Sequence, residues 1–143
     1  MSRILLDHQA VMEEEVVQFL NLKPGKKILD CTVGTGGHAG RILPNILPGG
    51  LLVGIDYDSG ILKTAENNLK DFKGNFVLVK DNFINFDKVL MNLGIDKIDG
   101  VVMDLGISSV QLDDALRGLS FKLDGPLDMR IDRSNFITAG DIV

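Results

Sequence analysis

Residues 27–39, KILDCTVGTGGHA, contain the turn that decides the fold. The apolar run from Lys27 to Cys31 predicts a buried strand, and a helix is expected from about His38 to Ile46. Between them, residues 34–39 fit the pattern G-x-G-x-x-G/A. Glycines at these positions allow a tight turn in which backbone N–H groups at a helix N-terminus can face a ligand.

The rest of the chain up to Asp104 continues this alternation of strands and helices. Apolar runs predict three further strands, and the last of these ends in Asp104. Helical spacing of apolar residues predicts a helix before the first strand and one after each of the next two. The expected strands are 51–56, 75–79 and 98–104, and the expected helices are 10–21, 58–69 and 86–93.

This order predicts an α/β fold with a Rossmann-like parallel sheet covered by helices on both faces. The strands are apolar throughout rather than alternating, which is typical of parallel strands buried on two sides. After Asp104 the pattern changes: residues 105–143 show few clean periods and are interrupted by glycines and a proline. We therefore expect a boundary after Ser109.

Composition and charge narrow the class of protein. The 143 residues are 45% hydrophobic, which suits one globular domain, and no apolar run approaches the roughly 18 residues of a membrane span. A single cysteine, Cys31, and the absence of metal-ligand spacing predict a cytoplasmic protein without a metal site. The net charge of −5 indicates that any nucleic acid must be held mostly by something outside this sequence.

Three aspartates at expected strand ends indicate the ligand. Asp56 lies 22 positions after Gly34, where an acceptor for ribose hydroxyls is expected. Asp30 and Asp104 end the first and fourth strands, so the crevice is acidic. Asp30 would repel a pyrophosphate but suits the cationic amino-acid part of S-adenosylmethionine. The alternatives are a purely structural turn, a capping role for Asp30, or a dinucleotide enzyme using NAD.

The loops after the third and fourth strands supply further candidates. Phe83 can cover the face of an adenine, although a core role is equally compatible with its sequence position. Ser108 and Ser109 follow the fourth strand, beside the place where a substrate would meet the methyl group. His38 is expected to line the cofactor pocket, whereas His8 belongs to no motif with a physical rationale.

Several of these segments, taken together, resemble the RsmH (MraW) family. The resemblance runs from about His8 to Asp132, and the run DGPLDMR is its most specific part. It is carried by CTVGTGGH at 31–38, GIDYD at 54–58, DLGISSVQLD at 104–113, RGLSF at 117–121 and DGPLDMR at 124–130. Glu13 departs from the family, which usually has an apolar residue at this position.

The resemblance implies an enzyme that methylates the exocyclic N4 of a cytosine in 16S ribosomal RNA of the small subunit, using S-adenosylmethionine. From their place after the fourth strand, Asp104 and the backbone of Ser108 and Ser109 are the expected catalytic residues, as acceptors of hydrogen bonds from that amine. The cofactor-binding residues expected from the turn, the strand ends and the resemblance together are Asp30, Gly34, Gly36, Gly37, His38, Asp56, Phe83, Asp104 and Gln111.

The family's proteins are longer than this chain, with a substrate-binding insertion after the fourth strand. We therefore expect residues 1–109 to be the first part of the cofactor-binding core and residues 110–143 to begin the insertion. The sheet would be incomplete on its C-terminal side, and its open edge could pair in a homodimer. Such a chain could bind the cofactor without turning it over.

Overall fold

The computed structural model describes residues 11–143, so His8 lies outside the described residues. The chain divides into two compact units, Met1–Asp104 and Leu105–Val143. This division falls at the change of pattern after Asp104, slightly before the expected boundary at residue 109. Each unit is described by itself below.

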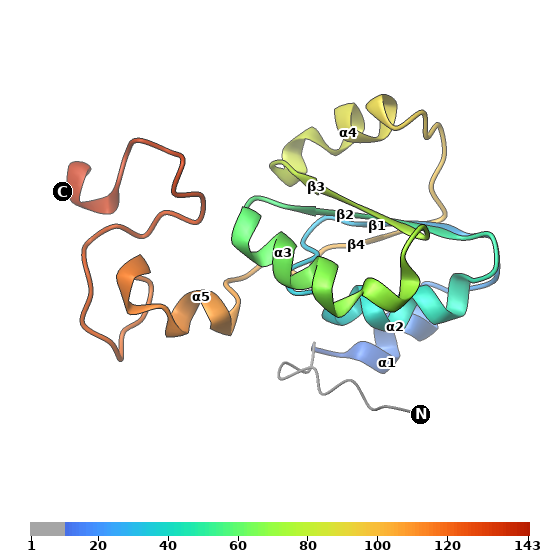
Figure 1. Ribbon diagram of the computed structural model, residues 1–143, viewed down its shortest axis with the longest axis horizontal. Coiled ribbons are helices and arrows are strands. Elements are labelled where there is room, and N and C mark those ends of the chain that lie inside the picture. The colour runs from blue at the N-terminus through green and yellow to red at the C-terminus, as the bar shows by residue number, and fades with distance from the viewer. Residues whose placement is uncertain (1–10) are drawn as a thin grey trace. The chain divides into compact units, whose positions relative to one another are not determined.

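The first unit is built on a four-stranded parallel sheet in the order β3-β2-β1-β4 (Figure 1). The predicted Rossmann-like α/β fold is confirmed. Every neighbouring pair of strands is parallel, and β4 pairs only with β1 among the described residues. The strands are β1 Lys27–Asp30, β2 Leu51–Asp56, β3 Phe76–Lys80 and β4 Gly100–Val102.

Helices cover both faces of this sheet. In Figure 1, α4 lies on one side of the strands and α1, α2 and α3 lie on the other. Each strand-to-strand connection that contains a helix is the crossover that parallel strands require. The helices are α1 Glu13–Phe19, α2 Gly37–Ile46, α3 Ser59–Asn68 and α4 Phe86–Asn92, with short 3-10 helices η1 Lys70–Phe72 and η2 Phe83–Asn85.

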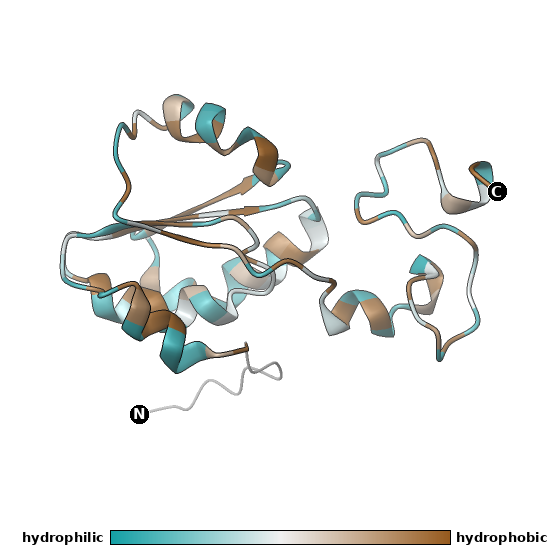
Figure 2. Ribbon diagram, turned by 180° about the vertical axis from the view of Figure 1, so that it is seen from behind, coloured by the Kyte–Doolittle hydropathy of each residue, from teal (hydrophilic) through white to brown (hydrophobic). Residues whose placement is uncertain are grey.

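The core is divided by the sheet into two layers. Successive residues of a strand point to opposite faces, and β1 shows this directly: Ile28 packs in the layer of α2, whereas Leu29 packs in the layer of α4. Leu52 and Val53 of β2 divide in the same way. The strands are accordingly hydrophobic along their length in Figure 2.

Two local features position the strand that ends in Asp56. Gly54 has no side chain because a Cβ there would lie 2.8 Å from Leu78 Cδ2 and 2.9 Å from Val33 Cγ2. Asp58 caps α3, since its Oδ1 accepts hydrogen bonds from the N–H groups of Gly60 at 2.8 Å and Ile61 at 3.3 Å. The expected start of this helix is thereby confirmed.

The expected boundaries of α1 and β4 were too wide. Met12 and Asn21 have positive φ values of 56° and 46°, and such left-handed residues interrupt a helix, so α1 spans only Glu13–Phe19. Glu13 contacts Arg41 of α2 at 2.6 Å, which joins the two helices. The strand β4 ends at Val102, and two residues later the Asp104 N–H donates to the side chain of Thr32.

The second unit is held by backbone packing rather than by a sheet. It contains α5 Ser109–Asp113, η3 Ala115–Arg117 and η4 Ala139–Asp141. A Cβ at Gly118 would collide with the carbonyl of Pro126, and one at Gly125 would collide with the carbonyl of Ala115. The segments RGLSF and DGPLDMR therefore pack main chain against main chain, which explains both glycines.

Arginines of the second unit are paired with nearby aspartates. Arg130 donates to both carboxylate oxygens of Asp128, at 2.7 and 2.8 Å, and these bonds hold the pKa of Asp128 well below its usual range. Arg117 and Arg133 both approach Asp114, at 3.4 and 3.5 Å. In residues 11–143 no helix combines the length and the hydrophobicity needed to cross a bilayer.

Candidate functional site

The glycine turn between β1 and α2 has the conformation that its sequence predicts. Gly34 and Gly36 have φ values of 53° and 91°, in the left-handed region that favours glycine. Gly36 is also closely packed, because a Cβ there would lie 3.2 Å from Leu69 Cγ. The turn leads directly into α2, which begins at Gly37.

The start of α2 offers backbone donors to a ligand. Gly40 N–H donates to Gly36 O at 2.8 Å and makes the first hydrogen bond of the helix. The N–H groups of Gly37, His38 and Ala39 precede this bond, as the first donors of any helix do. Together with the helix dipole they favour a negatively charged group at this end.

The strand register brings Asp30, Asp56 and Asp104 to one edge of the sheet. Asp30 is level with Gly54 on one side and with Val102 on the other. Asp56 and Asp104 therefore each come two residues beyond this level, on the strands that flank β1. Because parallel strands end on the same side, the three carboxyl groups gather where open α/β sheets bind ligands.

Asp30 is the most buried of these carboxyl groups, with 1% of its surface exposed. Its Oδ1 accepts a hydrogen bond from Thr32 N–H at 3.1 Å, whereas Oδ2 has no partner among the described residues. Burial raises the pKa of Asp30 to about 7, and the charges of Asp56 and Asp104 contribute. Asp30 is therefore a buried acceptor that a cationic group would satisfy.

Asp56 holds the glycine turn to the end of β2. Its Oδ2 accepts from Gly34 N–H at 3.0 Å and its Oδ1 accepts from Asp58 N–H at 2.9 Å. Burial raises the pKa of Asp56, although the backbone donors oppose this shift. Each carboxylate oxygen can accept more than one hydrogen bond, so the side chain can still accept from a ligand.

Asp104 is fixed through its backbone and reaches His38 with its side chain. Its N–H donates to Thr32 Oγ1 at 2.7 Å. Its Oδ2 lies 3.6 Å from His38 Nε2, and the two side chains differ in exposure, at 55% for Asp104 and 8% for His38. Nδ1 of His38 is buried without a hydrogen-bond partner in the described part of the chain.

Phe83 begins η2, just after β3, and its side chain is 39% exposed. The neighbouring polar groups are engaged locally: Asp81 Oδ1 accepts from Asn82 N–H at 2.7 Å and from Asn85 Nδ2 at 2.8 Å. These hydrogen bonds lower the pKa of Asp81. Phe83 therefore has an exposed aromatic surface beside an ordered turn.

Ser108, Ser109 and Gln111 belong to the second unit, where they form the start of α5. Ser108 Oγ accepts from Gln111 N–H at 3.2 Å, and Gln111 Oε1 accepts from Ser108 N–H at 3.0 Å. This reciprocal pair is a capping box, which orders the first turn of a helix. Within the unit, these two residues thus have a structural function that the sequence analysis did not assign.

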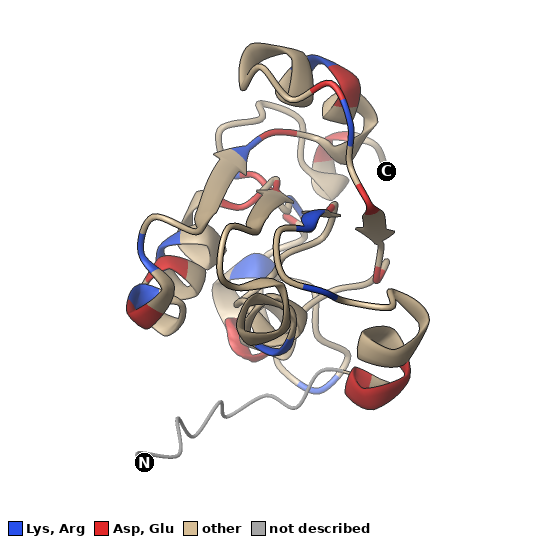
Figure 3. Cartoon of the chain, turned by 90° about the vertical axis from the view of Figure 1, so that its right-hand side faces the viewer, with Lys and Arg blue, Asp and Glu red and all other residues tan. Residues whose placement is uncertain are grey.

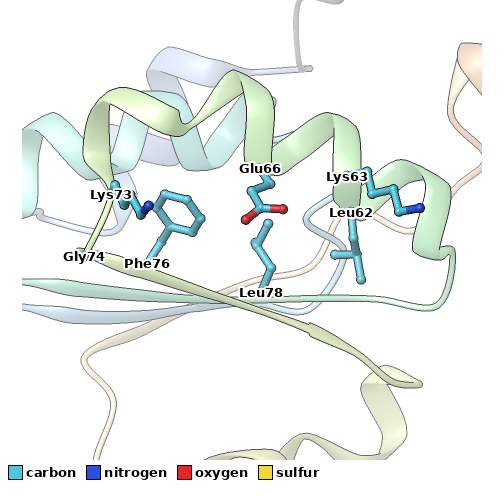
Figure 4. A pocket seen from close by; sticks show the side chains of 7 residues that line it. All are labelled: Leu62, Lys63, Glu66, Lys73, Gly74, Phe76 and Leu78. Carbon is cyan, nitrogen blue, oxygen red and sulfur yellow. The ribbon is translucent and has the colours of Figure 1, made fainter.

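Other polar or open features lie outside this arrangement. Cys31 is buried, and burial raises the pKa of its thiol, as expected for an inert core cysteine. A pocket of about 420 Å³ lies between α3 and β3, lined by Leu62, Lys63, Glu66, Lys73, Gly74, Phe76 and Leu78 (Figure 4). It shares no residue with the predicted site. No grouping of three metal-binding side chains occurs within residues 11–143.

The sequence analysis missed Thr32 and the second role of Asp56. Thr32 joins the ends of β1 and β4, because it donates its N–H to Asp30 and accepts from Asp104 N–H. No spacing pattern marks such a link, since its partners are 2 and 72 positions away. The available signal was the presence of a hydroxyl residue, Thr32, two positions before Gly34 in the turn.

Comparison with curated proteins finds long matches to ribosomal RNA methyltransferases. The chain is 46% identical over 136 residues to ribosomal RNA small subunit methyltransferase H of Clostridium botulinum strain Kyoto, covering 95% of this chain and 44% of that protein. It is also 46% identical over 136 residues to the protein of the same description in Desulfosudis oleivorans, again with 44% of that protein covered. The chain thus spans less than half the length of these relatives.

Solved structures with related folds include a putative ribosomal RNA methylase from Clostridium thermocellum, with a TM-score of 0.59 and 21% identity over 70% of this chain and 53% of that one. They also include an S-adenosylmethionine-dependent O-methyltransferase from Thermotoga maritima, with a TM-score of 0.55 and 19% identity over 68% of this chain and 37% of that one. At such identities these likenesses describe the fold. Residues 5–143 of the chain match the family model described as the MraW methylase family. The chain therefore belongs to the MraW methylase family.

Proposed function

We propose that this chain forms the cofactor-binding part of an S-adenosylmethionine-dependent methyltransferase that acts on the N4 amine of a cytosine in 16S ribosomal RNA. The observation that carries the proposal is the edge where the Gly34–Gly37 turn meets Asp30, Asp56 and Asp104. Membership of the MraW methylase family supports it. The cytoplasm, where bacterial ribosomes are assembled, is the corresponding location.

The residues at this edge fit the charges of the cofactor. The Oδ2 of Asp30, which has no partner in the described part of the chain, suits the ammonium group of the methionine part. The N–H groups at the start of α2 suit its carboxylate. Asp56 would accept from the ribose hydroxyls, and Phe83 would cover the adenine. A pyrophosphate, by contrast, would meet the carboxyl groups of the strand ends, which disfavours NAD.

The proposed reaction depends mainly on positioning. The bound cofactor supplies an electrophilic methyl group on a sulfonium. The cytosine amine is a weak nucleophile because its lone pair is conjugated with the ring, so in-line orientation contributes much of the acceleration. Asp104 would accept a hydrogen bond from this amine, with Ser108 and Ser109 nearby in sequence. The base would have to leave its stack to reach the edge.

Charge distribution supports an RNA grip that lies mostly outside this sequence. The chain has a net charge of −5, and Figure 3 shows lysines and arginines spread over several elements rather than collected on one. Arg117, Arg130 and Arg133 each contact an aspartate. Phosphate binding depends on an excess of positive charge, and the net negative charge of this chain supports an RNA grip made mostly elsewhere.

Calorimetric titration with S-adenosylmethionine and with NAD tests the cofactor, and a tritiated-methyl assay on small ribosomal subunits tests the transfer. We expect binding of S-adenosylmethionine and no binding of NAD. Asp104→Ala, in a protein that transfers the methyl group, should abolish transfer with an unchanged circular dichroism spectrum. An active and folded Asp104→Ala protein would end this assignment.

A cofactor-binding module without turnover is the second candidate. The net negative charge of the chain favours it, since this charge opposes a grip on RNA. Such a module would bind S-adenosylmethionine in calorimetry but would incorporate no tritium into the ribosomal subunits.

We also propose that the open edge of β4, where Val101 is 50% exposed, can pair in a homodimer. A monodisperse monomer in light scattering would contradict the dimer.

A further inference from the structure

We propose that His38 is a positioning residue, which orients the Asp104 carboxylate by donating a hydrogen bond from Nε2. This inference rests on the proposed function in one respect, namely that Asp104 accepts from the target amine. The contact between the two side chains itself does not depend on that function.

The side chain of Asp104 is held in one orientation only if another residue contacts it. Its backbone is anchored by the 2.7 Å hydrogen bond to Thr32 Oγ1. Its carboxylate is 55% exposed, and His38 is the side chain that it reaches in the described part of the protein. Without that contact, the carboxylate is free to change rotamer in solvent. An acceptor that must meet an incoming amine gains from being held in one orientation.

His38 is well suited to hold it, because its side chain is almost fully buried. It is the second residue of α2, and its side chain is only 8% exposed. Ala39 and Ile42 of the same helix are fully buried, so this helix face belongs to the core. An apolar side chain would pack there without leaving a polar atom unpaired. The buried Nδ1, which has no partner within residues 11–143, therefore indicates that histidine serves another purpose.

The position of the proton follows from these surroundings. A neutral imidazole carries one N–H, on either Nε2 or Nδ1. A proton on Nδ1 would be a buried donor without an acceptor, and the Nε2 lone pair would then face the Asp104 carboxylate. Both effects are unfavourable. A proton on Nε2 instead points toward Asp104 Oδ2, and leaves Asp104 Oδ1 for the amine of the substrate.

The separation of 3.6 Å between Nε2 and Oδ2 is longer than a hydrogen bond. Hydrogen bonds of catalytic groups are often long in the free protein and shorten in the complex with substrate. A small rotation of the exposed carboxylate brings its oxygen within range of the buried ring. The contact therefore tightens by movement of Asp104, since the buried His38 is held by the core.

Nuclear magnetic resonance of the ¹⁵N-labelled histidine rings tests the contact directly, because the chain contains only two histidines. His8→Gln assigns the remaining signals to His38. At a pH where the ring is neutral, we expect the Nε2–H form and a ring N–H signal shifted downfield by the carboxylate. Asp104→Ala should remove this downfield shift or lose the signal through exchange. A ring protonated on Nδ1, or an Nε2–H signal unchanged by Asp104→Ala, would overturn the proposal.

The positioning role has a second, kinetic readout on small ribosomal subunits. In a protein that transfers the methyl group, His38→Leu should lower kcat at least tenfold, a loss within the range expected from misplacement of a reacting group, and should change KM for S-adenosylmethionine less. His38→Gln keeps an N–H donor near Nε2 and should recover most of the rate. A change confined to KM would mean that His38 serves only cofactor binding. If the protein did not bind the cofactor at all, the proposed function would be contradicted. The nuclear magnetic resonance experiment would still show whether His38 contacts Asp104.

Discussion

Asparagine in place of Asp30 keeps the size of the side chain and an acceptor for Thr32 N–H, but it cannot ionise. Asp30 is 1% exposed, and burial raises its pKa from 3.8 to about 7. The folded protein therefore holds a proton on Asp30 at pH values where the unfolded chain has released it. Ionisation of this carboxyl group opposes folding, so the substitution should change how stability depends on pH.

The sign follows from proton counting. Between about pH 4 and pH 7 the folded state binds more protons at Asp30 than the unfolded state. The free energy of unfolding must then fall as the pH rises through this window. Each unit of pKa difference is worth about 1.4 kcal/mol. Between pH 5 and pH 8, the ionisation of Asp30 should lower the free energy of unfolding of the wild type by roughly 2 to 3 kcal/mol. The Asp30→Asn protein should not show this decrease.

Urea unfolding of both proteins at pH 5 and pH 8 measures this difference. Comparing the change with pH, rather than the stability at one pH, cancels any constant cost of burying the asparagine amide. The exposed Asp71, replaced by asparagine, is the matched control and should follow the wild type. If Asp30→Asn showed the same pH dependence as the wild type, the account of a protonated buried Asp30 would be refuted.

The same variant tests the charge of the site. A cationic ligand beside Asp30 favours the ionised carboxylate, so the affinity of the wild type for S-adenosylmethionine should rise up to about pH 7. Binding below this pH should release a proton, visible as a buffer-dependent calorimetric enthalpy. Asp30→Asn should bind more weakly and without this proton release. Proton release that persists in Asp30→Asn would assign the effect to another group.

Three further substitutions test the packing and the caps. Gly54→Ala places a Cβ within 2.8 Å of a neighbouring side chain and should destabilise the first unit by about 1 to 3 kcal/mol in urea unfolding. Asp58→Ala removes the cap of α3 and should cost about 0.5 to 2 kcal/mol, which Asp58→Ser should largely restore. Gly125→Ala places a Cβ against backbone in the second unit and should broaden or shift the amide resonances of residues 105–143. Gly106→Ala is the matched control, because no atom lies within 4 Å of its Cβ, and it should leave these resonances in place. Equal behaviour of the two glycine variants would contradict the backbone-packing explanation.

Much of the first unit could be predicted from its sequence because local and long-range preferences agree there. The apolar runs that predict strands are also the strands whose two faces are buried, as in β2. Asp58 caps α3 as a short polar residue before an amphipathic run should. The ends of α1 differ because Met12 and Asn21 adopt left-handed backbone conformations that their residue types do not require.

The site was predictable as a set of strand ends but not as a network. The register of parallel strands is enough to place Asp30, Asp56 and Asp104 on one edge. The hydrogen bonds that shape this edge depend on side-chain directions across strands, as in Asp56 to Gly34 and Asp104 to Thr32. Periodicity contains no information on those directions.

The motifs of the second unit were quoted for their resemblance alone. Their physical role became visible only in three dimensions, where Gly118 and Gly125 let two backbone segments touch. The ion pair of Asp128 with Arg130 spans two residues and orders the DGPLDMR segment locally. Asp128 Oδ1 also accepts from Arg130 N–H at 3.0 Å, a local turn that aspartate favours, but that preference does not predict the additional ion pair with the Arg130 side chain.

Isothermal titration of the folded chain with S-adenosylmethionine, repeated with NAD and with the Asp56→Asn protein, tests the central claim most directly. The account predicts one-to-one binding of S-adenosylmethionine, no heat from NAD and weaker binding by Asp56→Asn, whose carboxylate joins the Gly34 turn to the ligand edge. Binding of NAD in preference to S-adenosylmethionine, or S-adenosylmethionine binding unaffected by Asp56→Asn, would contradict it.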